Sequence, residues 1–200
     1  MNHLAHAWLA APDADVMFGS LIADFLRGAI DPALPRGVRI GIALHRAVDA
    51  YTDAHPEVAA ARALFEPPYR RYAGILLDVW FDHLLARDWS RHGSGSLQAF
   101  SRSVQDLLDL RSAELPPRMH GFARYLRAHD LPGRYREIPM IEDVLRGLSQ
   151  RLSRANPLAG ALPVIEARAA PLDRHFDAFF PDLIEHAVRE RGRLAATLPG

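Results

Sequence analysis

Apolar residues recur three or four positions apart along almost the whole chain, and no stretch shows a sustained apolar and polar alternation rich in β-branched residues. The first spacing is that of one face of an α-helix, and the second would indicate a half-buried strand. The chain has 200 residues and a mass of 22.3 kDa, enough to bury a sizeable core within one unit. We therefore expect an all-α fold, a single-domain helical bundle spanning residues 1–200.

The apolar spacing divides into helical stretches separated by short connections. Most prolines fall between these stretches or in their first turns, where a missing N–H and a fixed φ are tolerated. The expected helices cover residues 15–28, 36–53, 56–65, 68–91, 95–113, 117–129, 138–153 and 162–195.

Residue composition excludes several kinds of site. The chain contains no cysteine, so disulfides and thiolate ligands are excluded, and any metal would be held by imidazole and carboxylate groups. All 24 basic residues are arginine, which excludes a lysine Schiff base and a P-loop lysine. They balance 24 acidic residues, so the net charge predicts no general attraction to nucleic acid or to an anionic membrane.

The amino-terminal segment MNHLAHAWLAAP is apolar but lacks the basic start of a signal peptide. Asp13, Asp15 and Asp24 interrupt any longer apolar run, and no segment reaches the length of a membrane span. We expect a cytoplasmic protein.

The segment LHRAVDAYTDAHP, residues 44–56, places His45, Asp49 and Asp53 four residues apart. On a helix, which turns about 100° per residue, the apolar stripe centres on Leu44. His45 and Asp49 then lie at the shoulder of this stripe, and Asp53 lies further toward water. Such a row is typical either of a solvated polar face or of one side of a metal site.

The segment ILLDVWFDHLLARDW carries a similar pair of carboxylates. Asp78 and Asp82 have the same angular offset from the apolar stripe of their helix as His45 and Asp49 have from theirs. If the two helices pack against each other, all four groups meet at one point.

Asp24 is the third unusual carboxylate. In VMFGSLIADFLRG it falls within the apolar stripe, where a carboxylate needs a partner. Arg27 or Arg46 would be the structural partner, and a divalent cation is the functional alternative. One such pair alone is more often a solvated helix edge, but three clusters on neighbouring apolar helices favour a metal site. Imidazole and carboxylate ligands suit Mn²⁺, Mg²⁺ or Fe²⁺ in an open catalytic site.

The adjacent pair Asp82 and His83 is similar to the His-Asp pair of the helical HD metal phosphohydrolases. The two side chains point about 100° apart on a helix, so His83 is alternatively a core histidine or one that supports a ligand.

Seven segments stand out in order along the chain: MNHLAHAWLA, GSLIADFLRG, GIALHRAVDAYTDAHPEVAAAR, ILLDVWFDHLLARDWS, LPPRMHGFARYL, YREIPMIEDVLRGLSQR and LDRHFDAFFPDL. Together they resemble the acyl carrier protein phosphodiesterase family, also called acyl carrier protein hydrolase, over nearly the whole chain.

The resemblance implies an all-helical, divergent HD-phosphohydrolase-like enzyme that depends on a divalent metal, with Mn²⁺ expected before Mg²⁺ or Fe²⁺. The implied reaction removes 4′-phosphopantetheine from holo acyl carrier protein, the expected partner, and leaves the apo protein. This would place the chain in lipid metabolism, in fatty acid biosynthesis. The chain departs from the family pattern at His3 and Trp8, which puts both outside the expected site and leaves His6 inside it.

Each candidate site residue has an expected role. Asp49 would bind the metal or orient His45, and His83 would donate a proton to the leaving serine oxygen. Arg27 and Arg46 are candidate phosphate clamps, with surface salt bridging as the alternative. The expected metal ligands are Asp24, His45, Asp78 and Asp82, with His6 as a further candidate.

Acyl carrier proteins are acidic, so a neutral enzyme needs a local basic face to bind one. Candidate residues are those at expected helix starts and in loops, with ordinary solvation as the alternative: Arg70, Arg71, Arg118, Arg134 and Arg136.

Two other functions fit the same features. One is a metal phosphohydrolase that acts on a nucleotide or another small phosphodiester through the same helices. The other is a helical protein that binds a carrier protein without chemistry. No pattern in the sequence bears on oligomeric state.

Overall fold

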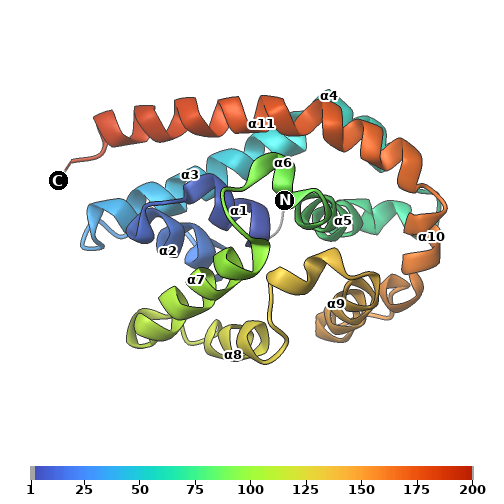
Figure 1. The fold of residues 1–200 in the computed structure, drawn as a ribbon, viewed down its shortest axis with the longest axis horizontal. Coiled ribbons are helices and arrows are strands. Elements are labelled where there is room, and N and C mark those ends of the chain that lie inside the picture. Colours follow the sequence, from blue (N-terminus) through green and yellow to red (C-terminus); the bar gives the residue numbers. More distant parts are fainter. Residues whose placement is uncertain (1–2, 200) are drawn as a thin grey trace.

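The computed structural model describes residues 3–199, and this part of the chain is built from helices and turns without a β-strand (Figure 1). The all-α expectation is confirmed. The α-helices are α1 (His3–Ala10), α2 (Ala14–Ile22), α3 (Arg36–Ala54), α4 (Pro56–Ala63), α5 (Ala73–Arg87), α6 (Trp89–His92), α7 (Leu97–Leu110), α8 (His120–Ala128), α9 (Ile138–Arg151), α10 (Leu162–Glu166) and α11 (Ala169–Thr197). Short 3-10 helices are η1 (Ala23–Phe25), η2 (Arg70–Tyr72), η3 (Ser112–Glu114), η4 (Gly133–Arg136) and η5 (Leu158–Gly160).

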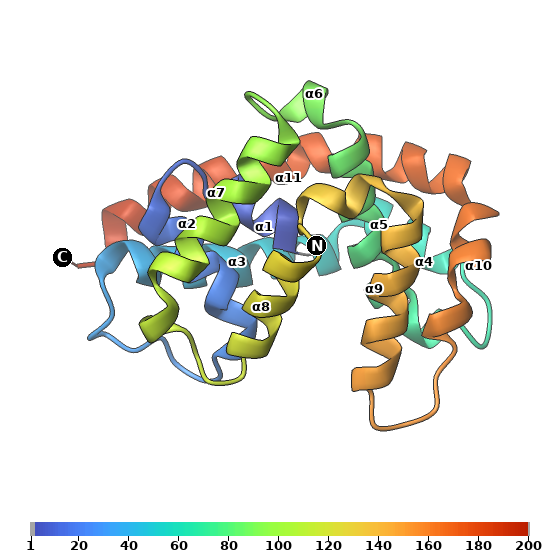
Figure 2. The ribbon, with the colours of Figure 1, turned by 60° about the horizontal axis from the view of Figure 1, so that its bottom comes forward.

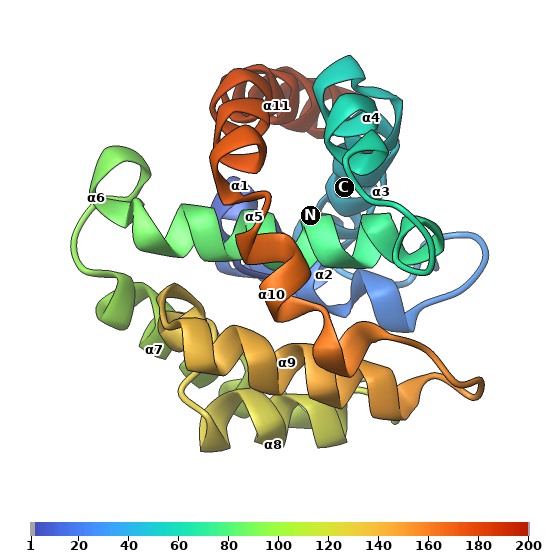
Figure 3. The same ribbon diagram turned by 90° about the vertical axis from the view of Figure 1, so that its right-hand side faces the viewer.

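The helices are arranged in tiers. The long helix α11 covers one side of the molecule, with α3 and α4 packed against it (Figure 1). Seen along the longest axis, α11 and α4 lie at the top, α5 crosses the middle, and α8 and α9 lie at the bottom (Figure 3). The buried apolar residues form one cluster that extends from α1 to α11. Helix α1 lies inside this arrangement, in contact with α2, α3 and α5.

Helices α2 and α3 cross at very short range because each carries a glycine at the crossing. A Cβ atom added to Gly19 would lie 2.1 Å from the Val38 carbonyl oxygen, and one added to Gly41 would lie 2.1 Å from the Val16 carbonyl oxygen. Neither approach leaves room for a side chain. This crossing fixes the end of α2, and therefore η1, beside the middle of α3.

The sequence prediction differs from the structure at several places, including the expected helix 15–28, which ends at Ile22 and is followed by η1. Helix α1 was not expected at all. The expected helix 68–91 is divided into η2, α5 and α6, and the expected helix 162–195 is divided into α10 and α11. At the second division, the guanidinium of Arg168 donates to the carbonyl oxygens of Leu64 at 2.7 Å and Val164 at 2.9 Å. These contacts stabilise the break, which Pro171 also favours because it has no N–H to donate to the carbonyl oxygen of Ala167.

Within residues 3–199, none of the helices combines the length and the apolar character that crossing a membrane requires.

Candidate metal centre

The position of α1 depends on a carboxylate from α5. Asp82 is buried; its Oδ2 accepts the Leu4 N–H at 2.8 Å and its Oδ1 accepts the Ala5 N–H at 3.2 Å. These N–H groups lie in the first turn of α1, where a helix supplies no backbone acceptor and where negative charge is favourable. Asp82 therefore fixes the start of α1 against α5, and with it the position of His6.

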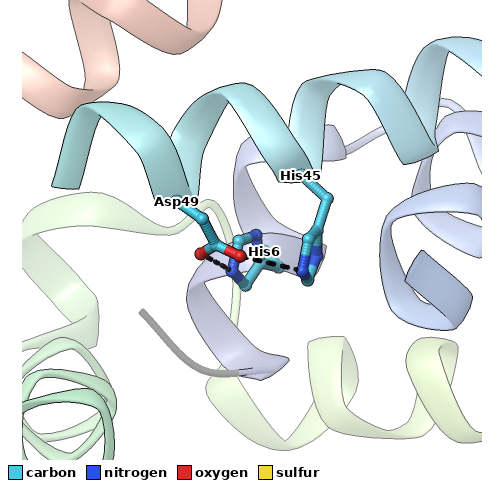
Figure 4. A group of neighbouring side chains, drawn as sticks. All are labelled: His6, His45 and Asp49. Carbon is cyan, nitrogen blue, oxygen red and sulfur yellow. Dashed lines mark hydrogen bonds and ion pairs between the residues drawn. The ribbon is translucent and has the colours of Figure 1, made fainter. Parts of the chain in front are cut away.

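Four side chains form one connected group, which we call the His/Asp cluster: His6 from α1, Asp24 from η1, and His45 and Asp49 from α3. Asp49 Oδ1 lies 3.1 Å from His6 Nε2, and Asp49 Oδ2 lies 3.2 Å from His45 Nε2 (Figure 4). Asp24 Oδ1 lies 3.1 Å from the same His45 nitrogen. Because His45 and Asp49 are four residues apart, they share one face of α3.

The two imidazole rings of the cluster are stacked, with centroids 3.7 Å apart and planes 18° apart. Both histidines are buried, whereas the side chains of Asp49 and Asp24 are 42% and 53% exposed. The Nδ1 atoms of both rings are buried without a hydrogen-bond partner among the described residues. Ring orientation therefore depends on stacking and on the carboxylates, which form the side of the cluster open to solvent.

Burial and hydrogen bonding distribute charge unevenly over the cluster. Burial, with the charge of His45, lowers the pKa of His6 to about 4. Burial opposes protonation of His45 too, but its hydrogen bonds with Asp24 and Asp49 outweigh this effect and raise its pKa to about 9. The hydrogen bond from His45 lowers the pKa of Asp24 to about 2. Burial would raise the pKa of Asp49, but hydrogen bonds with His45 and His6 hold it well below its usual range. At neutral pH the cluster thus carries two negative charges and one positive charge.

The donor atoms of the cluster fit a divalent cation. His6, His45 and Asp49 each offer one ligand atom, and these atoms lie within 4.8 Å of one another. Imidazole nitrogen with carboxylate oxygen is a donor set that suits Mn²⁺ and Fe²⁺. A cation would balance the excess negative charge, and it would replace the proton on His45 Nε2 because only neutral imidazole binds a metal.

Sequence comparison assigns nearly all of the chain to one family. The family model described as acyl carrier protein phosphodiesterase matches residues 1–183. The chain belongs to this family. A protein named acyl carrier protein phosphodiesterase from Serratia proteamaculans (strain 568) is 37% identical over 188 residues, which cover 94% of this chain and 97% of the relative. Its namesake from Yersinia pestis is 37% identical over 192 residues, covering 96% and 100%. The one from Escherichia coli O45:K1 (strain S88 / ExPEC) is 36% identical over 191 residues, covering 95% and 99%. No solved structure matches the chain.

In this acyl carrier protein phosphodiesterase family member, the acidic residues of α5 are arranged differently from the expectation. Helix α1 lies between α3 and α5, bonded to Asp49 on one side and to Asp82 on the other. The Asp82 carboxylate is therefore engaged with α1 backbone N–H groups. Burial raises the pKa of Asp78, and the charge of Asp49 adds to that rise. Their roles as ligands stay predictions.

His83 faces a different neighbour. Its Nδ1 lies 2.8 Å from the carbonyl oxygen of Tyr135 in η4, and its ring centroid lies 4.7 Å from that of Trp80. Burial lowers the pKa of His83. The neighbouring Asp82 faces α1, as the 100° offset between adjacent helical residues requires. The proton-donor role of His83 stays a prediction.

The expectation that Asp24 lies within an apolar helical stripe is wrong. Helix α2 ends at Ile22, and Asp24 lies in the following 3-10 turn, where the angular spacing of an α-helix no longer applies. Its side chain is 53% exposed and contacts His45 at 3.1 Å. Its partner is an imidazole, and neither of the two arginines considered from the sequence takes that place.

Those two arginines line a pocket of about 500 Å³ next to η1. Arg46 donates from one guanidinium nitrogen to the Gly28 carbonyl oxygen at 2.9 Å, which ties the connection after η1 to α3. Arg27 lies within that connection and is exposed. Apolar residues such as Phe25 and Leu115 form much of the remaining lining.

His3 is a residue that the sequence interpretation left out of the site. Burial lowers its pKa to about 4, while the charge of Asp24 acts in the opposite direction, so His3 lies within electrostatic reach of the cluster. The signal in the sequence is its spacing of three from His6, which places both on one face once the segment is a helix. Trp8 lies on another face of α1, with its ring 5.6 Å from that of Phe180.

Proposed function

We propose that this chain hydrolyses the phosphodiester that joins 4′-phosphopantetheine to holo acyl carrier protein, releasing apo acyl carrier protein and 4′-phosphopantetheine. The observation that carries this proposal is similarity at 36–37% identity, over 94–96% of this chain, to proteins named acyl carrier protein phosphodiesterase. A cytoplasmic location, with the carrier protein, is part of the same proposal.

The reaction adds water across one P–O bond. The water oxygen bonds to phosphorus, the bond from phosphorus to the serine oxygen of the carrier protein breaks, and that serine oxygen gains a proton. A bound divalent cation supplies a water of lowered pKa and positive charge for the non-bridging phosphate oxygens. We propose Mn²⁺, with Mg²⁺ and Fe²⁺ as the other cations whose ligand preferences match.

The roles of the chain's own residues follow from their positions. His6, His45 and Asp49 would hold the cation, with Asp24 completing the carboxylate side of the cluster. Asp49 in addition orients both imidazoles, since each of its oxygens contacts one ring. Because the pKa of His6 is about 4, its imidazole is neutral at pH 7 and needs no deprotonation before it binds a metal.

Residues outside the His/Asp cluster have other roles in this proposal. Asp78 remains a proposed ligand, since the charge of Asp49 acts on it, and Asp82 holds the start of α1 in place. His83 remains the proposed proton donor to the serine oxygen, and Arg27 and Arg46 the proposed phosphate clamps at the neighbouring pocket. We further propose a distant relation to the HD phosphohydrolases, supported by a cluster of imidazoles and carboxylates drawn from separate helices.

An acidic carrier protein would dock through exposed guanidinium groups. Arg70 and Arg71 lie in η2, Arg118 lies in the turn before α8, and Arg136 lies at the end of η4; all four are exposed. Arg134 pairs with Glu137 at 2.9 Å, which reduces its charge toward a partner. If this surface binds the substrate, raising the ionic strength lowers kcat/KM mainly through KM, since exposed charges are screened. A salt-independent kcat/KM would refute the docking surface.

The proposed function is tested by mass spectrometry of holo acyl carrier protein incubated with the protein and either Mn²⁺ or EDTA. We expect conversion to the apo protein with Mn²⁺ and none with EDTA. Asp49→Asn should abolish the conversion, while Asp53→Asn serves as a matched control, because Asp53 lies one turn further along α3, is 68% exposed and pairs with Arg62.

Other outcomes would refute the proposal in distinct ways. If the protein hydrolyses free nucleotides in a metal-dependent way and converts none of several holo carrier proteins, it is a phosphohydrolase that acts on a different substrate. Binding of the carrier protein without any chemistry, and without an effect of Asp49→Asn, would show a binding protein.

A further inference from the structure

A small pocket is lined by side chains from α8 and α9 and by His3 at the start of α1. Its volume is about 70 Å³. Figure 2 shows the ribbons of α8, in yellow, and α9, in orange. Apolar side chains from α8 and α9 form part of the lining, and four polar side chains complete it: His3, Tyr125, Tyr135 and Arg151.

Arg151 carries an exposed guanidinium group that has no carboxylate partner among residues 3–199. It is the last residue of α9. Its guanidinium carbon lies 5.7 Å from the centroid of the Phe122 ring and 6.0 Å from that of Tyr125, so two aromatic faces support it. By contrast Arg146, on the same helix, pairs with Asp143 at 2.8 Å and with Glu142 at 3.6 Å.

The two tyrosines add hydrogen-bond donors. Among the described residues, neither hydroxyl takes part in a hydrogen bond, although Tyr135 is only 3% exposed. Burial raises the pKa of Tyr135 and of Tyr125, so both hydroxyls keep their protons at neutral pH. A pocket with a free guanidinium and two protonated phenols has donors in excess of acceptors, which favours an anion.

His3 connects this pocket with the His/Asp cluster. It lines the pocket, and its ring lies 4.4 Å from the Phe122 ring. The charges of Asp24 and Arg151 both act on the His3 imidazole, in opposite directions. The Arg151 guanidinium and the Asp24 carboxylate therefore both lie within electrostatic reach of the His3 imidazole.

We propose that Arg151, with Tyr125 and His3 beside it, binds the phosphate of the phosphodiester substrate while the His/Asp cluster acts on it. This inference rests on the proposed function and adds a substrate-binding residue from α9 that is distinct from Arg27 and Arg46. A guanidinium binds two phosphate oxygens at once through its planar fork. The two aromatic rings already restrict the Arg151 side chain, so phosphate binding costs less conformational entropy.

The first experiment measures phosphate binding without catalysis. The protein in EDTA is titrated with inorganic phosphate, and the arginine Nε–Hε resonances are followed by NMR. We expect one resonance that shifts on titration and is missing from Arg151→Ala, and a phosphate Kd raised about tenfold or more in that variant. Arg151→Lys should recover part of the affinity, because it keeps the charge and loses the fork. Arg146→Ala is the matched control and should bind phosphate as the wild type does.

The second experiment measures turnover of holo acyl carrier protein with Mn²⁺. Arg151→Ala should raise KM about tenfold or more with unchanged thermal stability, and Arg146→Ala should leave KM unchanged. Wild-type phosphate affinity in Arg151→Ala would overturn the inference, whether or not the proposed function holds. If the wild type fails to convert holo carrier protein but Arg151→Ala loses phosphate binding, the proposed function fails and the anion pocket stands.

Discussion

Replacing Asp82 tests whether its carboxylate binds a metal or holds the start of α1 in place. The side chain is 1% exposed and its carboxylate accepts two N–H groups of α1, at 2.8 and 3.2 Å. A hydrogen bond to a charged group contributes about 1.5–3 kcal/mol, and a buried donor left without an acceptor is costly. Asp82→Ala should therefore reduce the free energy of unfolding by about 3–5 kcal/mol, and Asp82→Asn, which keeps one acceptor, by about 1.5–3 kcal/mol.

The assay is urea unfolding at pH 7 and 25 °C, followed by far-UV circular dichroism, with EDTA present so that bound metal does not contribute. With a slope of about 2 kcal/mol/M, Asp82→Asn should lower the midpoint by about 1 M and Asp82→Ala by about 2 M. Asp53→Asn, which removes an exposed ion pair, should change stability by less than about 1 kcal/mol.

A different pattern would refute the reasoning. If Asp82→Asn unfolds in EDTA at the wild-type urea concentration, and yet loses Mn²⁺ affinity by calorimetry, then Asp82 binds the metal and does not hold α1.

Three further predictions concern the cluster, its surroundings and the helix crossing. Asp49→Asn should weaken Mn²⁺ binding about 100-fold or more by calorimetry, and Asp53→Asn should leave it unchanged; equal affinities would exclude Asp49 as a ligand. His3 has a pKa of about 4 in the folded protein against 6.5 in the unfolded chain, so the unfolded chain binds more protons and stability falls as pH drops from 6.5 to 4. His3→Phe should reduce this loss by up to about 3 kcal/mol in urea titrations, and an unchanged pH dependence would contradict the assignment. Gly19→Ala would place a Cβ 2.1 Å from the α3 backbone and should lower Tm by several degrees, whereas Gly192→Ala has open space and should raise it slightly by calorimetry.

The part of the site predicted best from the sequence depends on contacts within one helix. His45 and Asp49 share a face because they are four residues apart, and their shoulder position on the wheel is consistent with a buried imidazole and a half-exposed carboxylate. Asp53 is exposed, as its angle on the wheel indicates. These positions require only that residues 36–53 form one amphipathic helix, which they do.

The parts that were missed depend on contacts between distant segments. The eight residues of α1 are too few to form a stable helix alone, and the carboxylate at its start comes from residue 82. No local pattern shows this, so His6 was placed by resemblance and His3 was excluded. For the same reason, the expected meeting of α3 and α5 carboxylates did not account for a helix lying between them. The prediction that Asp24 lies within an apolar stripe failed because α2 ends before it, and wheel angles apply only within an α-helix.

The bond between α1 and Asp82 spans 78 residues of sequence, and this separation affects folding during synthesis. At about 5–20 residues per second, a ribosome needs about 4–16 s to add the residues between the two partners. During this time the first turn of α1 lacks its carboxylate, and its apolar side chains lack the surface of α5. Helix α1 leaves the ribosome before α5 but can reach its final place only after α5 has emerged. A chaperone that binds exposed apolar segments would therefore meet this one before the His/Asp cluster has formed.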